Sequence, residues 1–290
     1  MLVTTAWLAA RLDDPDVVVV DMRWREDGSG PDLFERGRIP GSVFLDWSTD
    51  LIQADHPIAF TLAPADRFGS VMARCGIGDD TVVVAYADQL GSGPYRLWLA
   101  SSVYGHANVR VLDGGLERWV AEGRALTRET APRDPATWTP RRGAQLLVGA
   151  DEVAETANDP GAVVLDSRPA DQFRGTFVWF ETGPIAADPD GIARTPRGEL
   201  RAGRIPWAAS VPIAGLYRPD GTMKPPDELR ALFEKVGVGP ATRVITYCGV
   251  AISASGLAFG LRLAGVEDVA VYEASWEERG RDPARPVARG

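Results

Sequence analysis

The sequence is poor in the residues that build disulfides and metal sites. Its 290 residues include only two cysteines, Cys75 and Cys248, and two histidines, His56 and His106. Two distant cysteines form no disulfide framework and suit a reducing compartment. Neither histidine stands at ligand spacing from a cysteine, so we expect no metal and no other cofactor. Any cysteine chemistry must therefore use a single thiol.

Long apolar runs and clustered positive charge are also scarce. No run approaches the roughly 18 apolar residues of a membrane span, and the N-terminal MLVTTAWLAARLDDPD turns acidic too soon for a signal peptide. The formal charge is −9, and basic residues form no block apart from the arginine-containing tail after Arg279. Such a charge repels phosphate backbones. We therefore expect a cytoplasmic protein with neither a membrane nor a nucleic acid as its partner.

The two halves of the chain resemble each other in four segments that occur in the same order. CGIGDDTVVVAYA, ending at Ala87, aligns without a gap on VGVGPATRVITYC, ending at Cys248. VVVVDMR around Asp21 recurs as AVVLDSR around Asp166, ERGRIPG recurs as RAGRIPW, and YGHANVRVLDGG corresponds to LAGVEDVAVYEA. A chain of this length suits two domains. The sequence therefore predicts two copies of one domain.

The segment between the copies has the composition of an interdomain linker. TRETAPRDPATWTPRRG, from Thr127, is rich in Pro, Arg and Thr and lacks helix or strand periodicity. We therefore place an N-terminal domain at 1–126, a linker at 127–144 and a C-terminal domain at 145–290.

Each copy alternates short apolar strands with helical stretches. Strands are predicted at 17–20, 81–86 and 109–112, and at the matching positions 162–166, 243–247 and 268–272. Continuous β-branched runs between helices indicate parallel strands covered on both faces. The predicted fold class is α/β, with two tandem doubly wound domains, each a parallel sheet flanked by helices.

Cys248 stands where such sheets bind their ligands, at the carboxyl end of a strand. The strand RVITY precedes it, and GVAIS and then an apolar helical stretch, ASGLAFGLRLAG, follow. Backbone N–H groups of a tight loop and the dipole of the next helix favour a thiolate over a thiol. The same loop would hold the anionic outer sulfur of a persulfide. Cys75 has no such loop after it and is expected to be inert.

These residues resemble the rhodanese family, in which a strand leads through Y-C-G-x-x-x-S/T-A-S into an apolar helix, with GRIP-type and LDGG-type segments in a duplicated chain. The resemblance is strongest to the two-domain thiosulfate and 3-mercaptopyruvate sulfurtransferases, whose N-terminal copy lacks the cysteine. In this chain Ala87 stands at the position that corresponds to Cys248. It implies that Cys248 takes sulfur from a small-molecule donor and passes it to cyanide, a thiol or a protein acceptor. The implied binding loop comprises Gly249, Val250, Ala251, Ile252 and Ser253.

Departures from the family pattern bear on the sulfur donor. The loop CGVAIS is neutral, whereas the thiosulfate type has basic residues after the cysteine and the mercaptopyruvate type reads C-G-S-G-V/I-T. A neutral loop favours a monoanionic carboxylate donor held by an arginine. Arg174, in DQFRGT, matches a family position near the donor. Arg38 and Arg204 replace the usual histidine of G-H-I-P-G, so no proton relay can use that position.

Two functions of other classes compete with sulfur transfer. Cysteine phosphatases with this type of loop need an arginine six positions after the cysteine, and that position is Ala254. A non-catalytic rhodanese module would instead bind partners or sense oxidants through a reactive thiol.

Two further features carry weaker predictions. Asp21 with Arg23, and Asp166 with Arg168, recur at the same strand end in both copies, and we interpret them as structural ion pairs. The second copy also has an insertion of about 21 residues that contains Phe177, Trp179 and Phe180. Its aromatic residues are expected to pack, or to form a lid or docking surface.

Overall fold

The computed structural model describes residues 1–130, 132–180 and 183–290, and for Phe180 the backbone alone. The chain divides into two compact units. The first comprises residues 1–55, 62–144 and 217–223, and the second comprises 56–61, 145–216 and 224–290. No helix among the described residues is long and apolar enough to cross a membrane.

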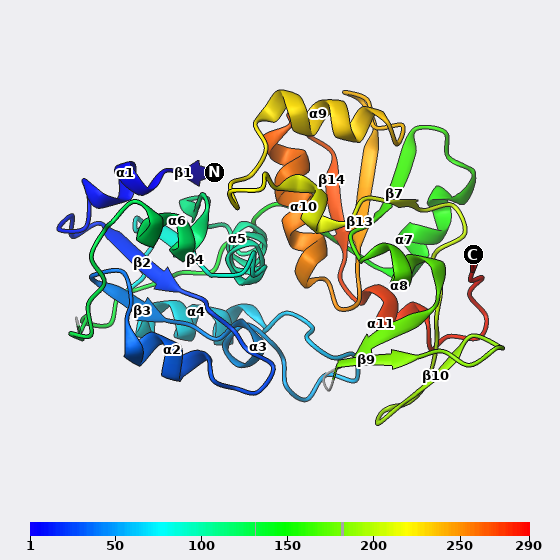
Figure 1. Ribbon diagram of the computed structural model, residues 1–290, viewed down its shortest axis with the longest axis horizontal. Helices are drawn as coiled ribbons and strands as arrows, with labels where there is room; N and C mark the ends of the chain where they lie inside the picture. Colours follow the sequence, from blue (N-terminus) through cyan, green and yellow to red (C-terminus); the bar gives the residue numbers. More distant parts are fainter. Residues whose placement is uncertain (131, 181–182) are drawn as a thin grey trace. The chain divides into compact units, whose positions relative to one another are not determined.

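The first unit is built on a parallel sheet of five strands in the order β1-β5-β4-β2-β3 (Figure 1). Its strands are β1 (Leu2–Val3), β2 (Val17–Asp21), β3 (Ser42–Phe44), β4 (Val82–Tyr86) and β5 (Val109–Leu112). Its helices are α1 (Thr5–Ala9), α2 (Gly30–Arg36), α3 (Trp47–Asp50), α4 (Ala65–Arg74), α5 (Gly93–Val103) and α6 (Gly115–Ala121). Apolar side chains of α1 and α6 pack on one face of the sheet, and α5 packs on β4 and β5.

The second unit repeats this topology, with the strand order β6-β14-β13-β7-β12. Its sheet contains β6 (Leu147–Val148), β7 (Ala162–Asp166), β12 (Ala209–Ser210), β13 (Arg243–Tyr247) and β14 (Val269–Tyr272). Its helices are α7 (Ala150–Glu155), α8 (Ala170–Arg174), α9 (Pro226–Glu234), α10 (Ile252–Leu263) and α11 (Ser275–Arg279), with 3₁₀ turns at Thr156–Asn158 and Ile213–Leu216. The duplication and the α/β fold class are confirmed, and the predicted strands lie within one residue of those observed.

The core of the second unit covers both faces of β13. Alternate residues of the sheet, such as Ile245 and Tyr247, pack with Val153 of α7 and Trp276 of α11. The other face of β13 and β14 is covered by α10, which is almost wholly buried from Ala254 to Leu261 (Figure 1). A strand buried on both faces can open only at its ends, so the residues after Tyr247 emerge at the carboxyl edge of the sheet.

The insertion of the second copy folds into two antiparallel hairpins. β8 (Phe177–Phe180) pairs with β9 (Gly183–Ala186), and β10 (Ile192–Thr195) pairs with β11 (Gly198–Arg201). Trp179 on β8 is 54% exposed. Val178, which points the other way along the strand, is buried in the core of the second unit.

The predicted linker, residues 127–144, is counted in the first unit. Thr127 forms an antiparallel bridge with Arg38, and Trp138 packs edge-on against Phe68 of α4. Trp138 is only 8% exposed, so this proline-rich stretch contributes to the core although its described residues form no helix or extended strand.

Candidate active site

Cys248 lies in a four-residue loop, 248–251, between the end of β13 at Tyr247 and the start of α10 at Ile252. Cys248 is 3% exposed, whereas Gly249, Val250, Ile252 and Ser253 are half-buried. Of the predicted binding-loop residues, Gly249, Val250 and Ala251 lie in this loop at the carboxyl edge of the sheet, and Ile252 and Ser253 are the first residues of α10. The Cys248 side chain is therefore buried, whereas the residues that follow it are partly exposed to solvent.

The loop enters α10 through a left-handed residue. Ala251 has φ 63° and ψ 7°, a conformation that non-glycine residues adopt at a cost. Its carbonyl accepts the N–H of Ser255 at 3.2 Å and the Ser255 hydroxyl at 2.6 Å. These bonds hold the strained residue in place. The first N–H groups of α10 face the loop as at any helix N-terminus, where an anion is favoured.

The N-terminal residues of α11 hold the loop from the other side. Ser275 Oγ accepts the N–H of Cys248 at 3.2 Å and that of Ala251 at 3.1 Å. The N–H of Trp276 donates to the Cys248 carbonyl, and the N–H of Glu277 donates to the Gly249 carbonyl, both at 3.0 Å. The loop is thus tied to α11 by four hydrogen bonds.

A buried ion pair lies under the loop. Arg168 donates to Asp166 at 2.6 Å and to the Gly203 carbonyl at 2.7 Å, and its guanidinium lies 4.5 Å from the centre of the Trp276 ring. Burial opposes the charge of Arg168, but Asp166, and after it Tyr247 and Cys248, raise its pKa above the usual value. Most of this positive charge is balanced by Asp166, so the pair chiefly fixes the end of the sheet.

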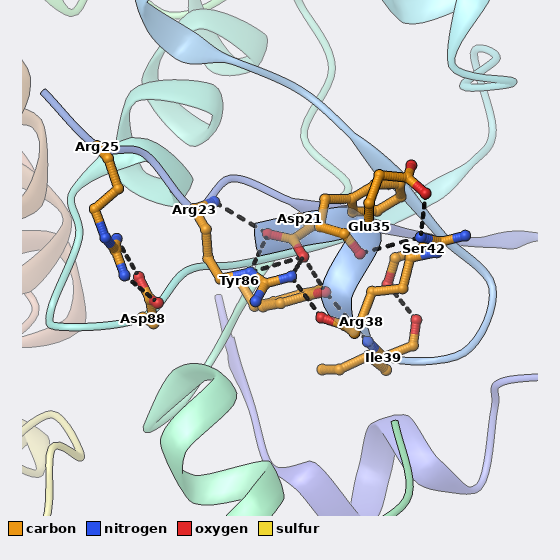
Figure 2. A network of polar contacts seen from close by, with 11 residues as sticks. Asp21, Arg23, Arg25, Glu35, Arg38, Ile39, Ser42, Tyr86 and Asp88 are labelled. Atoms are coloured by element: carbon orange, nitrogen blue, oxygen red, sulfur yellow. Dashed lines mark hydrogen bonds and ion pairs between the residues drawn. The ribbon is translucent and has the colours of Figure 1, made fainter. Parts of the chain in front are cut away.

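The first unit has the same ion pair, as Figure 2 shows. Arg23 donates to Asp21 at 2.6 Å and to the Gly37 carbonyl at 2.7 Å, and the Tyr86 hydroxyl donates to Asp21 at 2.5 Å. The pair occurs in both units, whether or not a cysteine follows, which favours a structural role.

A pair of hydroxyl groups borders the loop. Ser167, which is fully buried, lies with its Oγ 2.8 Å from Ser253 Oγ and 3.2 Å from the Tyr247 carbonyl. The Ser167 N–H donates to the same carbonyl at 3.0 Å. Ser253 is thereby fixed at the first turn of α10.

The corresponding loop of the first unit is occupied by the protein's own charges. Ala87 replaces the cysteine. The carboxylate of the next residue, Asp88, accepts two hydrogen bonds from the Arg25 guanidinium, at 2.9 and 2.7 Å (Figure 2). The N–H of Gln89 donates to the carboxylate of Glu117 at 2.6 Å. This loop therefore has no thiol, and the backbone N–H of Gln89 is already bound to a carboxylate of the protein.

Arg174 is placed apart from the loop contacts described above. It ends α8, has a side chain 52% exposed and pairs with Asp171. It also lines an open surface pocket with Thr176, Asp188 and Arg289, and no residue of the 248–253 segment belongs to that lining. Its predicted contact with a donor stays a prediction.

The second cysteine has the properties of a core residue. Cys75 directly follows α4, as its C-terminal cap, and is 5% exposed. Burial raises the pKa of its thiol to about 11. A neutral, enclosed thiol is a poor nucleophile.

Comparison with protein families identifies both halves of the chain. The model of the rhodanese-like domain matches residues 4–122 and again residues 149–280. The chain belongs to the rhodanese family. Full-length relatives within the family include the sulfur carrier protein TtuD of Thermus thermophilus, which is 34% identical over all of this chain and 97% of its own length.

Other rhodanese relatives bear the names of different sulfur-transfer proteins. A probable 3-mercaptopyruvate sulfurtransferase of Pseudomonas aeruginosa is 34% identical, and the thiosulfate sulfurtransferase of Rattus norvegicus is 31% identical, each over the whole chain and 98% and 95% of their own lengths. The crystal structure of the 3-mercaptopyruvate sulfurtransferase SseA from Escherichia coli superimposes with a TM-score of 0.79 at 27% identity, covering 95% of this chain and 98% of SseA.

Sequence reasoning missed the residues that hold the rhodanese loop from α11. The sequence alignment pairs YGHANVRVLDGG, which ends at Gly115, with LAGVEDVAVYEA, which ends at Ala274, one residue short of Ser275. The hydrogen bonds from Leu116 and Trp276 to the carbonyls of Ala87 and Cys248 place Gly115 opposite Ser275. A side chain in one copy opposite a glycine in the other was the available signal, because only the copy with the cysteine needs that side chain.

Proposed function

We propose that this rhodanese is a sulfurtransferase that carries sulfur as a persulfide on Cys248. The observation that carries the proposal is the enclosure of the only favourably placed thiol by a short loop at the N-terminus of α10. Loop N–H groups and the helix dipole stabilise both the thiolate and the anionic outer sulfur of a persulfide. The relatives named as sulfurtransferases and as a sulfur carrier support the same chemistry.

The proposed reaction has two displacements at sulfur. The Cys248 thiolate attacks the transferable sulfur of the donor, a new S–S bond forms, and the donor's bond to that sulfur breaks with its electron pair. Sulfite leaves from thiosulfate, and the enolate of pyruvate, which takes up a proton, leaves from 3-mercaptopyruvate. A nucleophile such as cyanide or a thiolate then attacks the outer sulfur and releases the Cys248 thiolate.

The charge of the loop favours 3-mercaptopyruvate as the donor. Residues 249–253 contain no cation, and Arg168 is already paired with Asp166. A dianion such as thiosulfate would therefore enter without a dedicated counter-ion, whereas a single carboxylate needs only one arginine. Arg174 is our candidate for that arginine.

Intact-protein mass spectrometry tests the persulfide. Incubation with 3-mercaptopyruvate or thiosulfate should add about 32 Da, the mass of one sulfur, and Cys248→Ser should abolish the gain. Absence of a gain with either donor would leave a non-catalytic module that binds partners or senses oxidants. A larger yield with thiosulfate than with 3-mercaptopyruvate would overturn the donor preference.

Steady-state kinetics test Arg174. Arg174→Ala should raise KM for 3-mercaptopyruvate about tenfold or more, the effect of one charge-assisted contact, with kcat little changed. Arg230→Ala is a matched control, because Arg230 has the same 52% exposure and pairs with Asp227 three residues away. An equal effect of both variants on KM would remove Arg174 from the proposed site.

A further inference from the structure

The peptide bond between Gly249 and Val250 is held with its carbonyl toward α11. The Gly249 carbonyl accepts the N–H of Glu277 at 3.0 Å. In a planar trans peptide the C=O and the N–H point in opposite directions. The N–H of Val250 therefore faces away from α11, on the side of the loop where it can serve an anion.

The equivalent peptide of the first unit has the reverse orientation. The two units are in register here, because Leu116 donates to the Ala87 carbonyl at 2.9 Å just as Trp276 donates to that of Cys248. Yet the N–H of Gln89, the counterpart of Val250, donates to the carboxylate of Glu117 at 2.6 Å. Glu117 is the counterpart of Glu277. A carboxylate of the following helix can thus capture a loop N–H in this fold.

Glu277 has the same carboxylate but a different partner. Arg281 donates to Glu277 Oε1 from Nε at 2.9 Å and from Nη2 at 2.8 Å, and the Glu277 side chain is only 8% exposed. Arg281 is held in turn by the Arg197 carbonyl at 3.1 Å and the Glu199 carbonyl at 3.3 Å, in the β10–β11 hairpin. The counterpart of Arg281 in the first unit is Ala121, which has no charge.

We propose that Arg281 is a positioning residue that keeps the Glu277 carboxylate out of the Cys248 loop and so leaves the Val250 N–H to the sulfur anion. The inference rests on the proposed chemistry at Cys248. Without Arg281, the buried carboxylate lacks its cation, and the Val250 N–H is the donor that its counterpart uses in the first unit. Capturing it reverses the Gly249–Val250 peptide and places a negative charge beside the sulfur. The insertion hairpin thereby gains a role, because it anchors Arg281.

The test compares Arg281→Ala with Arg281→Ala/Glu277→Met, in which a side chain of similar length has no oxygen. One measurement is the alkylation rate of Cys248 by iodoacetamide, expressed as the ratio of the rate at about pH 7 to that at about pH 9, which cancels differences in access. The other is the half-life of the persulfide. Arg281→Ala should lower both about tenfold, the effect of one hydrogen bond to a charged group, and the double variant should restore both.

Arg281→Gln gives a second route if Arg281→Ala unfolds, because its amide can still donate to the hairpin carbonyls although it carries no charge. It should show the same loss and the same rescue by Glu277→Met. Wild-type values in the single variants, or a loss that Glu277→Met does not restore, would overturn the inference. A wild-type protein that forms no persulfide would instead overturn the proposed function, and the alkylation ratios would still test Arg281.

Discussion

Ser275 holds the backbone of Cys248, because its Oγ accepts the Cys248 N–H at 3.2 Å. The same oxygen accepts the N–H of Ala251 at 3.1 Å and donates to the Tyr272 carbonyl at 2.8 Å. One fully buried hydroxyl thus binds both ends of the loop. The first unit has Gly115 at this position, where a Cβ would lie 2.4 Å from the Ala87 carbonyl.

Removing the Ser275 hydroxyl should shorten the life of the persulfide. Ser275→Ala leaves two loop N–H groups without an acceptor, a cost of about 1–3 kcal/mol for each group, and we expect the half-life to fall at least about tenfold. Ser275→Gly should show the same fall although glycine suits the φ of 50° at this position. A wild-type half-life in the glycine variant would mean that the backbone, and not the hydroxyl, sets the loop. Ser42→Ala, which removes a buried hydroxyl from the first unit, is the control.

A cysteine introduced into the first unit should stay inactive. In Ala87→Cys/Cys248→Ser, the thiol would stand beside Asp88, and the Gln89 N–H would still be bound to Glu117. Nearby carboxylates disfavour a thiolate. Incubation with either sulfur donor should give no gain of about 32 Da, the mark of a persulfide. A stoichiometric gain would show that the fold alone, without the features of the second loop, is sufficient.

The buried ion pairs should matter equally for the stability of both units. Asp166→Asn leaves Arg168 buried without its counter-ion, and Asp21→Asn does the same to Arg23. Each variant should lose about 3–5 kcal/mol of unfolding free energy in urea titrations, the usual cost of breaking a buried pair. A loss below about 1 kcal/mol, typical of exposed pairs, would contradict the structural role.

Cys75 should make the protein less stable in alkali. Burial raises the pKa of its thiol from 9.0 to about 11, so between these values the native state keeps a proton that the unfolded chain loses. Stability due to this group is therefore complete below about pH 9 and falls by about 2–3 kcal/mol as the pH rises to about 11. Cys75→Ala should flatten the decline, measured as unfolding free energy against pH. An unchanged slope would contradict the assignment.

The architecture could be predicted from the sequence for two reasons. The β-branched runs that form the strands are local patterns, and the internal duplication is visible when the two halves of the sequence are compared. The strand ending at Tyr247 and the apolar helix after the loop follow from such local patterns, although α10 begins at Ile252, two residues before the predicted stretch from Ala254. Contacts made by side chains distant in sequence did not follow. Nothing local indicates that Ser275 meets Cys248, or that Trp138 fills a gap beside Phe68 in a proline-rich stretch.

The insertion shows the same limit. Its aromatic residues indicated packing or an exposed surface, and of the aromatic side chains that the structure describes there, Phe177 is half-buried and Trp179 is exposed. The tie from the β10–β11 hairpin to Glu277 depends on the turn after α11, which places Arg281, and no periodicity encodes it.

The shared strand order of the two units makes the molecule its own reference. The strand that ends before Cys248 has a counterpart at the same place in a sheet that lacks the thiol. The same substitution can be made in the first unit in one variant and in the second unit in another. Comparing the two variants under identical conditions separates what the scaffold requires from what the sulfur requires. Temperature, salt and expression then cancel, which comparisons between separate proteins cannot achieve.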